Sequence, residues 1–173
     1  MSLQHNLSDD IHKGAYVQNG DPGAVGAKVL WIDTTSGFVL KKRNAGDTGW
    51  DTIADLNQDV LIIPIGDETT AITVGAAKYT FRMPYPFKLS AVRASLSTAS
   101  SSGNPAVNIK EAGVSIFSTT ITIDSGEKTS QTAATPAVIS DPDLADDAEI
   151  TIDIDTAGTG AKGLKITLIG HRV

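Results

Sequence analysis

The chain has 173 residues, a formal net charge of −6 and no cysteine, which excludes disulfide frameworks, thiol catalysis and cysteine-ligated metal sites. The acidic balance argues against a nucleic-acid surface, which requires clustered lysine and arginine, and no apolar run approaches the roughly 20 residues that cross a bilayer. Isoleucine, threonine and valine make up 47 residues, and because their branched side chains favour strands, the composition predicts an all-β protein.

The first part of the chain is predicted to form an arm and a small β unit. Residues 1–27 are polar and glycine-rich and keep no regular apolar period, which indicates an extended arm. The apolar runs 28–33 and 37–43 are separated by three residues, a spacing typical of a β-hairpin, and residues 50–53 would add a third strand. A unit this small is marginal by itself, so we expect it to pack against a partner or a neighbouring subunit.

Residues 54–59 are predicted to be a polar linker. The chain would then divide into an N-terminal arm with a small β-hairpin unit, residues 1–56, and a second domain, residues 57–173. From residue 60 onward, predicted strands recur every 8–15 residues, with turns between them and no convincing helical segment. This pattern predicts an antiparallel β-sandwich that is jelly-roll-like.

Three positions in the second domain carry more specific predictions. The apolar residues of segment 87–96 change parity near Ser90, which predicts a bulge in that strand. Leu144 lies among aspartates and a proline, and it is expected to point inward as a plug. Residues 148–155 alternate between apolar and polar, which predicts a half-buried strand whose solvated face includes Asp153.

The acidic stretch 141–155 is the first candidate for chemistry, because its seven carboxylates could supply oxygen ligands to calcium. It does not match the EF-hand pattern, and its members divide between a turn and a strand, so a solvated acidic surface is the preferred interpretation. Paired carboxylates could also hydrolyse glycosides, but no cluster of aromatic residues accompanies them as a sugar platform.

Nucleophilic catalysis is not indicated. The serines lack the nucleophile-elbow pattern, and the three histidines lie near the chain ends, where a general base would be poorly held. We therefore expect no enzyme activity and no catalytic, cofactor-binding or metal-binding residues.

Four residues of the N-terminal region are instead the candidate partner-binding residues: His12, Trp31, Phe38 and Trp50. His12 is expected to be solvated or to lie at an interface. The two tryptophans are expected to form a miniature core or to contact a neighbour.

The second domain resembles a β-sandwich module found in virion proteins of tailed bacteriophages. This resemblance is carried by the segments 61–67, 79–89, 92–99, 121–130, 150–155 and 163–170. The segments 10–14, 26–40 and 46–50 are similar to N-terminal segments of phage head-decoration and tail proteins.

The resemblance implies a non-enzymatic structural protein of the virion that assembles as a homotrimer. In the first hypothesis the protein is a capsid decoration (cement) protein that is made in the host cytoplasm. It binds the major capsid protein on the capsid surface and stabilises the head. In the alternative it is a tail fibre or receptor-binding protein that contacts the tail or a host receptor. The short chain without a fibrous repeat favours decoration, and neither nucleic acid nor a membrane is an expected partner. An enzyme that degrades host carbohydrate is the third hypothesis.

Overall fold

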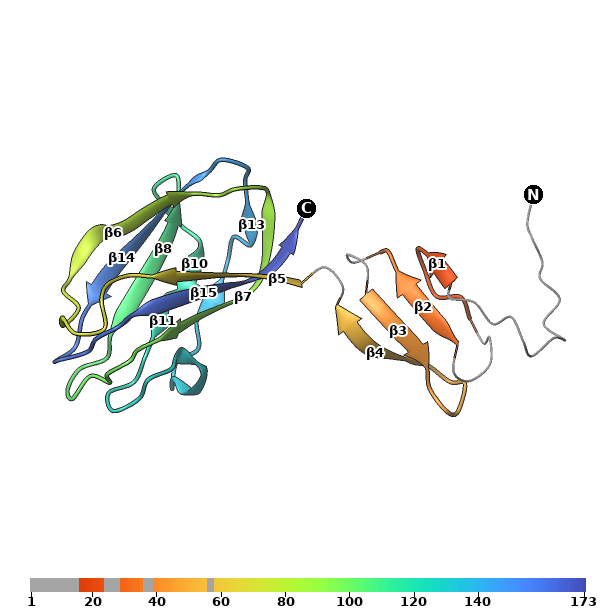
Figure 1. Cartoon of the computed structure of the whole chain (residues 1–173), viewed down its shortest axis with the longest axis horizontal. Helices are drawn as coiled ribbons and strands as arrows, with labels where there is room; N and C mark the ends of the chain where they lie inside the picture. Colours follow the sequence, from red (N-terminus) through yellow and green to blue (C-terminus); the bar gives the residue numbers. More distant parts are fainter. Residues whose placement is uncertain (1–15, 24–28, 36–38, 56–57) are drawn as a thin grey trace, which may run out of the picture. The chain divides into compact units, whose positions relative to one another are not determined.

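The computed structural model describes residues 16–23, 29–35, 39–55 and 58–173 (Figure 1). The chain separates into two compact units, Met1–Asn57 and Gln58–Val173, which we call the N-terminal unit and the C-terminal unit. The described residues contain strands and one 3-10 turn, η1 (Ser130–Thr132), and no α-helix, which confirms the all-β prediction. In this part of the chain, no helix has the length and apolar character needed to span a membrane.

The N-terminal unit is a four-stranded mixed sheet with the order β1-β2-β3-β4. Its strands are β1 (Tyr16–Gln18), β2 (Leu30–Asp33), β3 (Val39–Arg43) and β4 (Trp50–Asp55). The antiparallel pairing of β2 with β3 and of β3 with β4 confirms the predicted hairpin and third strand.

Two predictions for this region are wrong. Strand β1 lies within the predicted arm and pairs in parallel with β2, and its three residues are too few to establish an apolar period. The predicted linker over 54–59 is also wrong, because β4 continues to Asp55 and the next strand begins at Gln58. Polar residues can belong to β4 and to the strand that begins at Gln58, because each of these strands has an exposed face.

The C-terminal unit is sandwich-like and consists of antiparallel sheets. Its strands are β5 (Gln58–Pro64), β6 (Gly75–Arg82), β7 (Phe87–Ser95), β8 (Ala106–Glu111), β9 (Val114–Ser115), β10 (Phe117–Thr119), β11 (Ile121–Thr122), β12 (Val138–Ile139), β13 (Asp143–Leu144), β14 (Glu149–Thr156) and β15 (Lys165–Arg172). One sheet has the order β13-β7-β15-β5, and a second has the order β11-β8-β14-β6 with β9 beside β8. The short strands β10 and β12 form a separate pair.

The core of the C-terminal unit lies between the two larger sheets. Ile150 and Ile152 of β14 are fully buried in one sheet. Ile166 and Leu168 of β15 are fully buried in the other sheet. Leu144, on the short strand β13, is only 2% exposed, which confirms the predicted plug. Because alternate residues of a strand point to opposite faces, the regular spacing of these side chains places them in one apolar layer.

The bulge predicted near Ser90 is confirmed. Ile169 pairs with Ala91 whereas the next residue, Gly170, pairs with Leu89, so no residue of β15 lies opposite Ser90 in the ladder. The extra residue reverses the side-chain parity of β7, and the apolar residues on both sides of it can therefore face the core.

Gly170 should be essential to packing at this bulge. A Cβ atom at this position would lie 2.6 Å from Cε1 of Phe87 and would also overlap the backbone carbonyl oxygen of Lys88. We expect Gly170→Ala to lower the free energy of unfolding of the C-terminal unit by about 1–3 kcal/mol, as overpacking does. Urea denaturation would measure the loss, with Gly66→Ala as the control because its Cβ would meet nothing within 4 Å. Equal stability of the two variants would contradict this account.

The predicted solvation of Asp153 is wrong. Its side chain lies on β14 among alternating exposed positions, but the residue is only 5% exposed. The reason is local, because Asp153 forms an ion pair with Lys110 on β8 and accepts a hydrogen bond from the backbone N–H of Ala77 on β6. Groups from both neighbouring strands therefore cover a carboxylate that the alternation alone would leave in solvent.

Candidate functional site

The N-terminal sheet brings together two of the four predicted partner-binding residues. The ring centroids of Trp31 on β2 and Trp50 on β4 lie 5.2 Å apart in an edge-to-face arrangement. Trp31 is only 4% exposed, whereas Trp50 is half-buried. The other two residues, His12 and Phe38, lie outside the described residues. Trp31 thus belongs to the interior of its own unit, and its predicted role with a partner stays a prediction.

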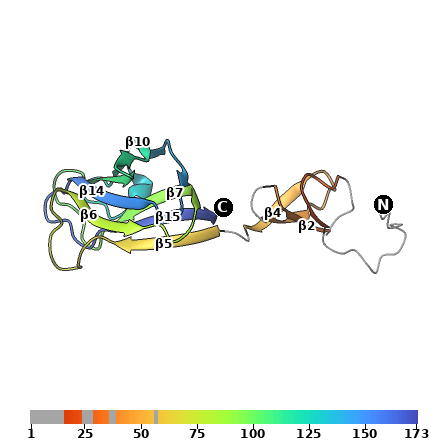
Figure 2. The same ribbon diagram turned by 90° about the horizontal axis from the view of Figure 1, so that it is seen from above.

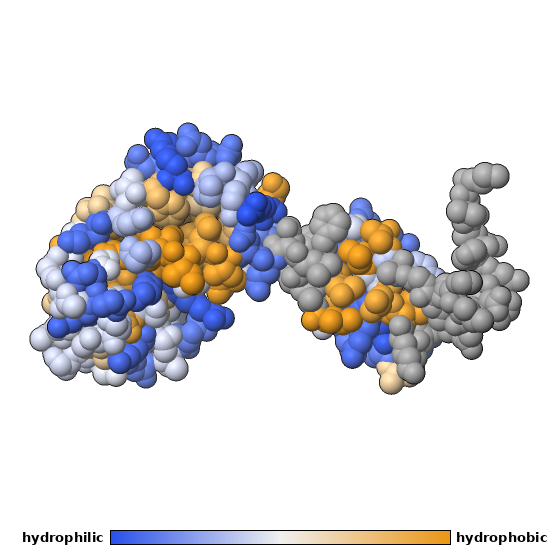
Figure 3. Space-filling view, in the orientation of Figure 1, coloured by the Kyte–Doolittle hydropathy of each residue, from blue (hydrophilic) through white to orange (hydrophobic). Residues whose placement is uncertain are grey.

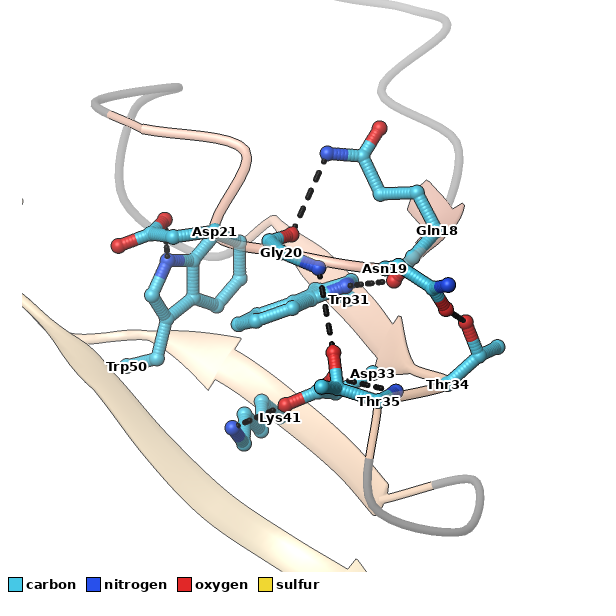
Figure 4. A network of polar contacts seen from close by, with 10 residues as sticks. All are labelled: Gln18, Asn19, Gly20, Asp21, Trp31, Asp33, Thr34, Thr35, Lys41 and Trp50. Carbon is cyan, nitrogen blue, oxygen red and sulfur yellow. Dashed lines mark hydrogen bonds and ion pairs between the residues drawn. The ribbon is translucent and has the colours of Figure 1, made fainter.

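The last residue of β1 and the segment that follows it fix both indole rings (Figure 4). The indole N–H of Trp31 donates to the carbonyl oxygen of Gln18 at 3.0 Å, and that of Trp50 donates to Oδ1 of Asp21 at 2.7 Å. The same Asp21 oxygen accepts a hydrogen bond from the N–H of Gly23. These bonds, that from Gly23 first, lower the pKa of Asp21 below its ordinary value. The end of β1 is therefore tied to Trp31, and the segment after it is tied to Trp50.

Charged groups complete this face of the sheet. Lys41 lies with Nζ 2.6 Å from Oδ2 of Asp33 and 4.5 Å from the centre of the Trp31 ring. The guanidinium of Arg43 lies 5.2 Å from the centre of the Trp50 ring, and its Nε donates to Asp47. Cations over aromatic rings are attracted by the negative ring face. We call this side of the sheet the tryptophan face; it is occupied by the unit's own side chains.

The Asp33 carboxylate should make the N-terminal unit sensitive to acid. The hydrogen bond from Lys41, followed by that from the N–H of Thr35, lowers the pKa of Asp33 from 3.8 to about 2. A carboxylate whose pKa is lower in the folded state stabilises that state above its unfolded pKa, and this stabilisation is lost as the carboxylate is protonated. We therefore expect the unit to lose stability between about pH 4 and about pH 2.

Circular dichroism and fluorescence of the tryptophans during acid titration would check this expectation. Asp33→Asn retains an oxygen for the Thr35 N–H and should weaken the acid dependence over that range. Asp51→Asn, at an exposed position on β4, is the control and should leave the dependence unchanged. Identical titrations of the wild type and Asp33→Asn would refute the assignment.

The opposite side of the N-terminal sheet carries a row of apolar residues, next to which Lys42, paired with Leu30, and Asp51, paired with Lys42, are charged and exposed. Val17 pairs with Ile32, and Ile32 pairs with Leu40, so these side chains form one row across three strands. Leu30 lies on the same side, two residues before Ile32. Val17 is 63% exposed and Leu30 is 40% exposed, and Figure 3 shows hydrophobic side chains gathered on this sheet. We call Val17, Leu30, Ile32 and Leu40 the apolar face; three of these residues lie on the predicted hairpin, and only Val17 depends on the unpredicted strand β1.

The C-terminal unit has a second exposed apolar region between β5 and β6. Each of these strands lies at the edge of its sheet, and Figures 1 and 2 show them along the same side of the unit. Figure 3 shows hydrophobic surface there, bordered by hydrophilic residues. A groove of about 280 Å³ is lined by Leu61, Ile62, Ile63, Pro64, Tyr79, Phe81, Arg82 and Pro84. We call it the edge groove.

The acidic stretch 141–155 is partly neutralised by basic groups from other strands. Lys88 lies 3.2 Å from Asp143, and Arg82 lies 3.7 Å from Glu149. Asp153 pairs with Lys110. Within the ranges that the structure describes, no group of three or more histidine, aspartate or glutamate side chains could hold a metal ion.

In comparisons with protein-family models, with curated proteins and with solved structures, no match to the chain is found. The resemblance to phage virion proteins therefore stays a prediction, and the function has to be argued from the arrangement of the chain's own residues.

Proposed function

We propose that this protein is a non-enzymatic structural component of a tailed-phage virion, a homotrimeric capsid decoration (cement) protein that binds the major capsid protein on the head surface. The apolar face of the N-terminal sheet is the observation that carries the proposal. Val17 and Leu30 are large exposed hydrophobic residues on a sheet too small to bury both of its sides. Exposed apolar surfaces of this kind are typical of protein contacts.

The two sides of the N-terminal sheet support a division of roles. On the tryptophan face, Trp31, Asp33 and Arg43 are all less than 10% exposed and are held by hydrogen bonds and ion pairs within the unit. The four residues of the apolar face are uncharged, as expected at the centre of a contact, and Lys42 and Asp51 on the same side would lie at its polar rim. In the proposal, the tryptophan face holds the sheet rigid while the apolar face packs on the capsid.

The C-terminal unit would project from the head surface. Its strands support the finer description as a jelly roll, because the first four strands and the last three alternate between the two large sheets: β5, β7, β13 and β15 lie in one, and β6, β8 and β14 in the other. Trimerisation fits a three-fold position on a capsid lattice, and a small sheet gains stability when neighbouring subunits cover it.

A tail-associated receptor-binding protein is the second candidate. The edge groove supports it, because Tyr79 and Phe81, with ring centroids 6.3 Å apart, line an exposed depression on the C-terminal unit. In this alternative the C-terminal unit contacts the host surface, and the N-terminal unit attaches to the tail.

Deletion of the gene in a phage that encodes this chain separates the two candidates. A decoration protein predicts heads that lose their DNA on heating or osmotic shock and regain resistance when the purified full chain is added. A receptor-binding protein predicts particles that resist these treatments but fail to adsorb, and purified chain that blocks adsorption of the wild type. Deleted particles that are both resistant and infectious would refute both candidates.

A further inference from the structure

Among the residues that the structure describes, strand β6 has one side without a neighbouring strand in its sheet. It is the terminal strand in the order β11-β8-β14-β6. The free N–H and C=O groups of such a strand can pair with a strand of another molecule, and proteins often prevent this with a bulge that twists the edge.

A bulge of this kind interrupts β6. Ile152 pairs with Tyr79, whereas Ile154, two residues later on β14, pairs with Gly75, four residues earlier on β6. Residues 76–78 therefore leave the regular ladder. Ala77 at the centre of the bulge has a φ of 46°, in the left-handed region that is unfavourable for alanine. A contact with another part of the unit must therefore stabilise this backbone conformation.

The carboxylate of Asp153 holds it. Oδ1 accepts a hydrogen bond from the Ala77 N–H at 2.7 Å, and Oδ2 lies 2.6 Å from Nζ of Lys110. Burial by itself raises the pKa of Asp153, but the bonds from Lys110 and Ala77 outweigh it and lower the pKa below its ordinary value. The group is therefore ionised at neutral pH, and its two oxygens join β6, β14 and β8.

We propose that Asp153 and Lys110 form a clip that keeps the free edge of β6 kinked and so prevents it from pairing with a second copy of this chain. Without the clip, residues 76–78 would no longer be fixed, and a shift in register would extend the regular edge of Tyr79–Arg82 along the rest of β6. This inference is independent of the proposed function. Any association through the apolar face or through β5 is common to the wild type and the variants, so a difference between them reports on β6.

The test is the state of association of the full chain, measured by sedimentation velocity over a range of concentrations. We expect Asp153→Ala to form larger species than the wild type, with at least a doubling of the weight-average mass at high concentration. Hydrogen exchange should show that the β6 amides become protected as these species form. Asp153→Asn retains an oxygen for the Ala77 N–H and should associate less than Asp153→Ala. Asp146→Ala, the same substitution at an exposed position outside the clip, is the control.

Loss of stability alone could also cause association, so a core variant is needed. Ile166 is fully buried on β15, in the large sheet that does not contain the clip, and Ile166→Ala or Ile166→Val can be chosen to match the unfolding midpoint of Asp153→Ala. The proposal is overturned if the matched core variant associates equally, or if folded Asp153→Ala has the same mass as the wild type. Should Asp153→Ala fail to fold, Lys110→Met and Asp153→Asn decide the question by the same criteria.

Discussion

Replacement of Trp31 by alanine should unfold the N-terminal unit and leave the C-terminal unit folded. Trp31 is 4% exposed, its ring packs against Trp50 and under Lys41, and its N–H bonds the backbone of Gln18. Truncation of a large buried aromatic residue costs about 3–5 kcal/mol. A sheet of four short strands has little stability to lose, so this cost should exceed what the unit has.

Hydrogen exchange with segment resolution would measure this effect. In Trp31→Ala, the amides of β2 and β3 should exchange at the rate of an unfolded chain while those of β14 and β15 stay protected. Leu30→Ala, the neighbouring residue on the opposite face, is the control and should leave both units protected. Protection of β2 and β3 in Trp31→Ala would show that the tryptophan face is not the core of the unit.

Introducing charged residues on the apolar face should abolish attachment to the head without unfolding the protein. Val17 and Leu30 are both exposed, so Val17→Glu with Leu30→Glu should leave the sheet intact. In the proposed contact these carboxylates would be buried without partners. We expect binding to undecorated heads to weaken by at least about 100-fold, which corresponds to roughly 3 kcal/mol.

Binding of the purified full chain to heads from the deletion phage would be measured by co-sedimentation. Val114→Glu is the matched control, because Val114 is 70% exposed on the C-terminal unit and undergoes the same chemical change. It should bind as the wild type does. If the double variant is folded and also binds as the wild type does, the apolar face is not the attachment surface.

Much of this fold could be predicted because the relevant signals are local. The hairpin of β2 and β3 follows from two apolar runs and a short turn, and the bulge at Ser90 follows from a change of parity within one strand. Strand β1 could not be predicted, since it exists through pairing with β2, whose first residue lies 14 positions beyond Tyr16. The burial of Asp153 was missed for the same reason, because its partners lie on two other strands.

The candidate site was predicted in part. Sequence reasoning found the two tryptophans, and the structure brings them together, but it could not tell which side of the sheet they occupy. That distinction changes the surface offered to a partner. With Trp31 buried and Val17 and Leu30 exposed, the surface proposed for attachment is the apolar face and not the tryptophans themselves.

Cryo-electron microscopy of the intact virion tests the central claim most directly, because it locates the chain and resolves which side of the N-terminal sheet meets its neighbours. Our account predicts trimers at three-fold positions of the head, with Val17, Leu30, Ile32 and Leu40 packed on the major capsid protein. Density for the chain on the tail would contradict it. So would trimers on the head whose C-terminal units contact the capsid while the apolar face is turned to solvent.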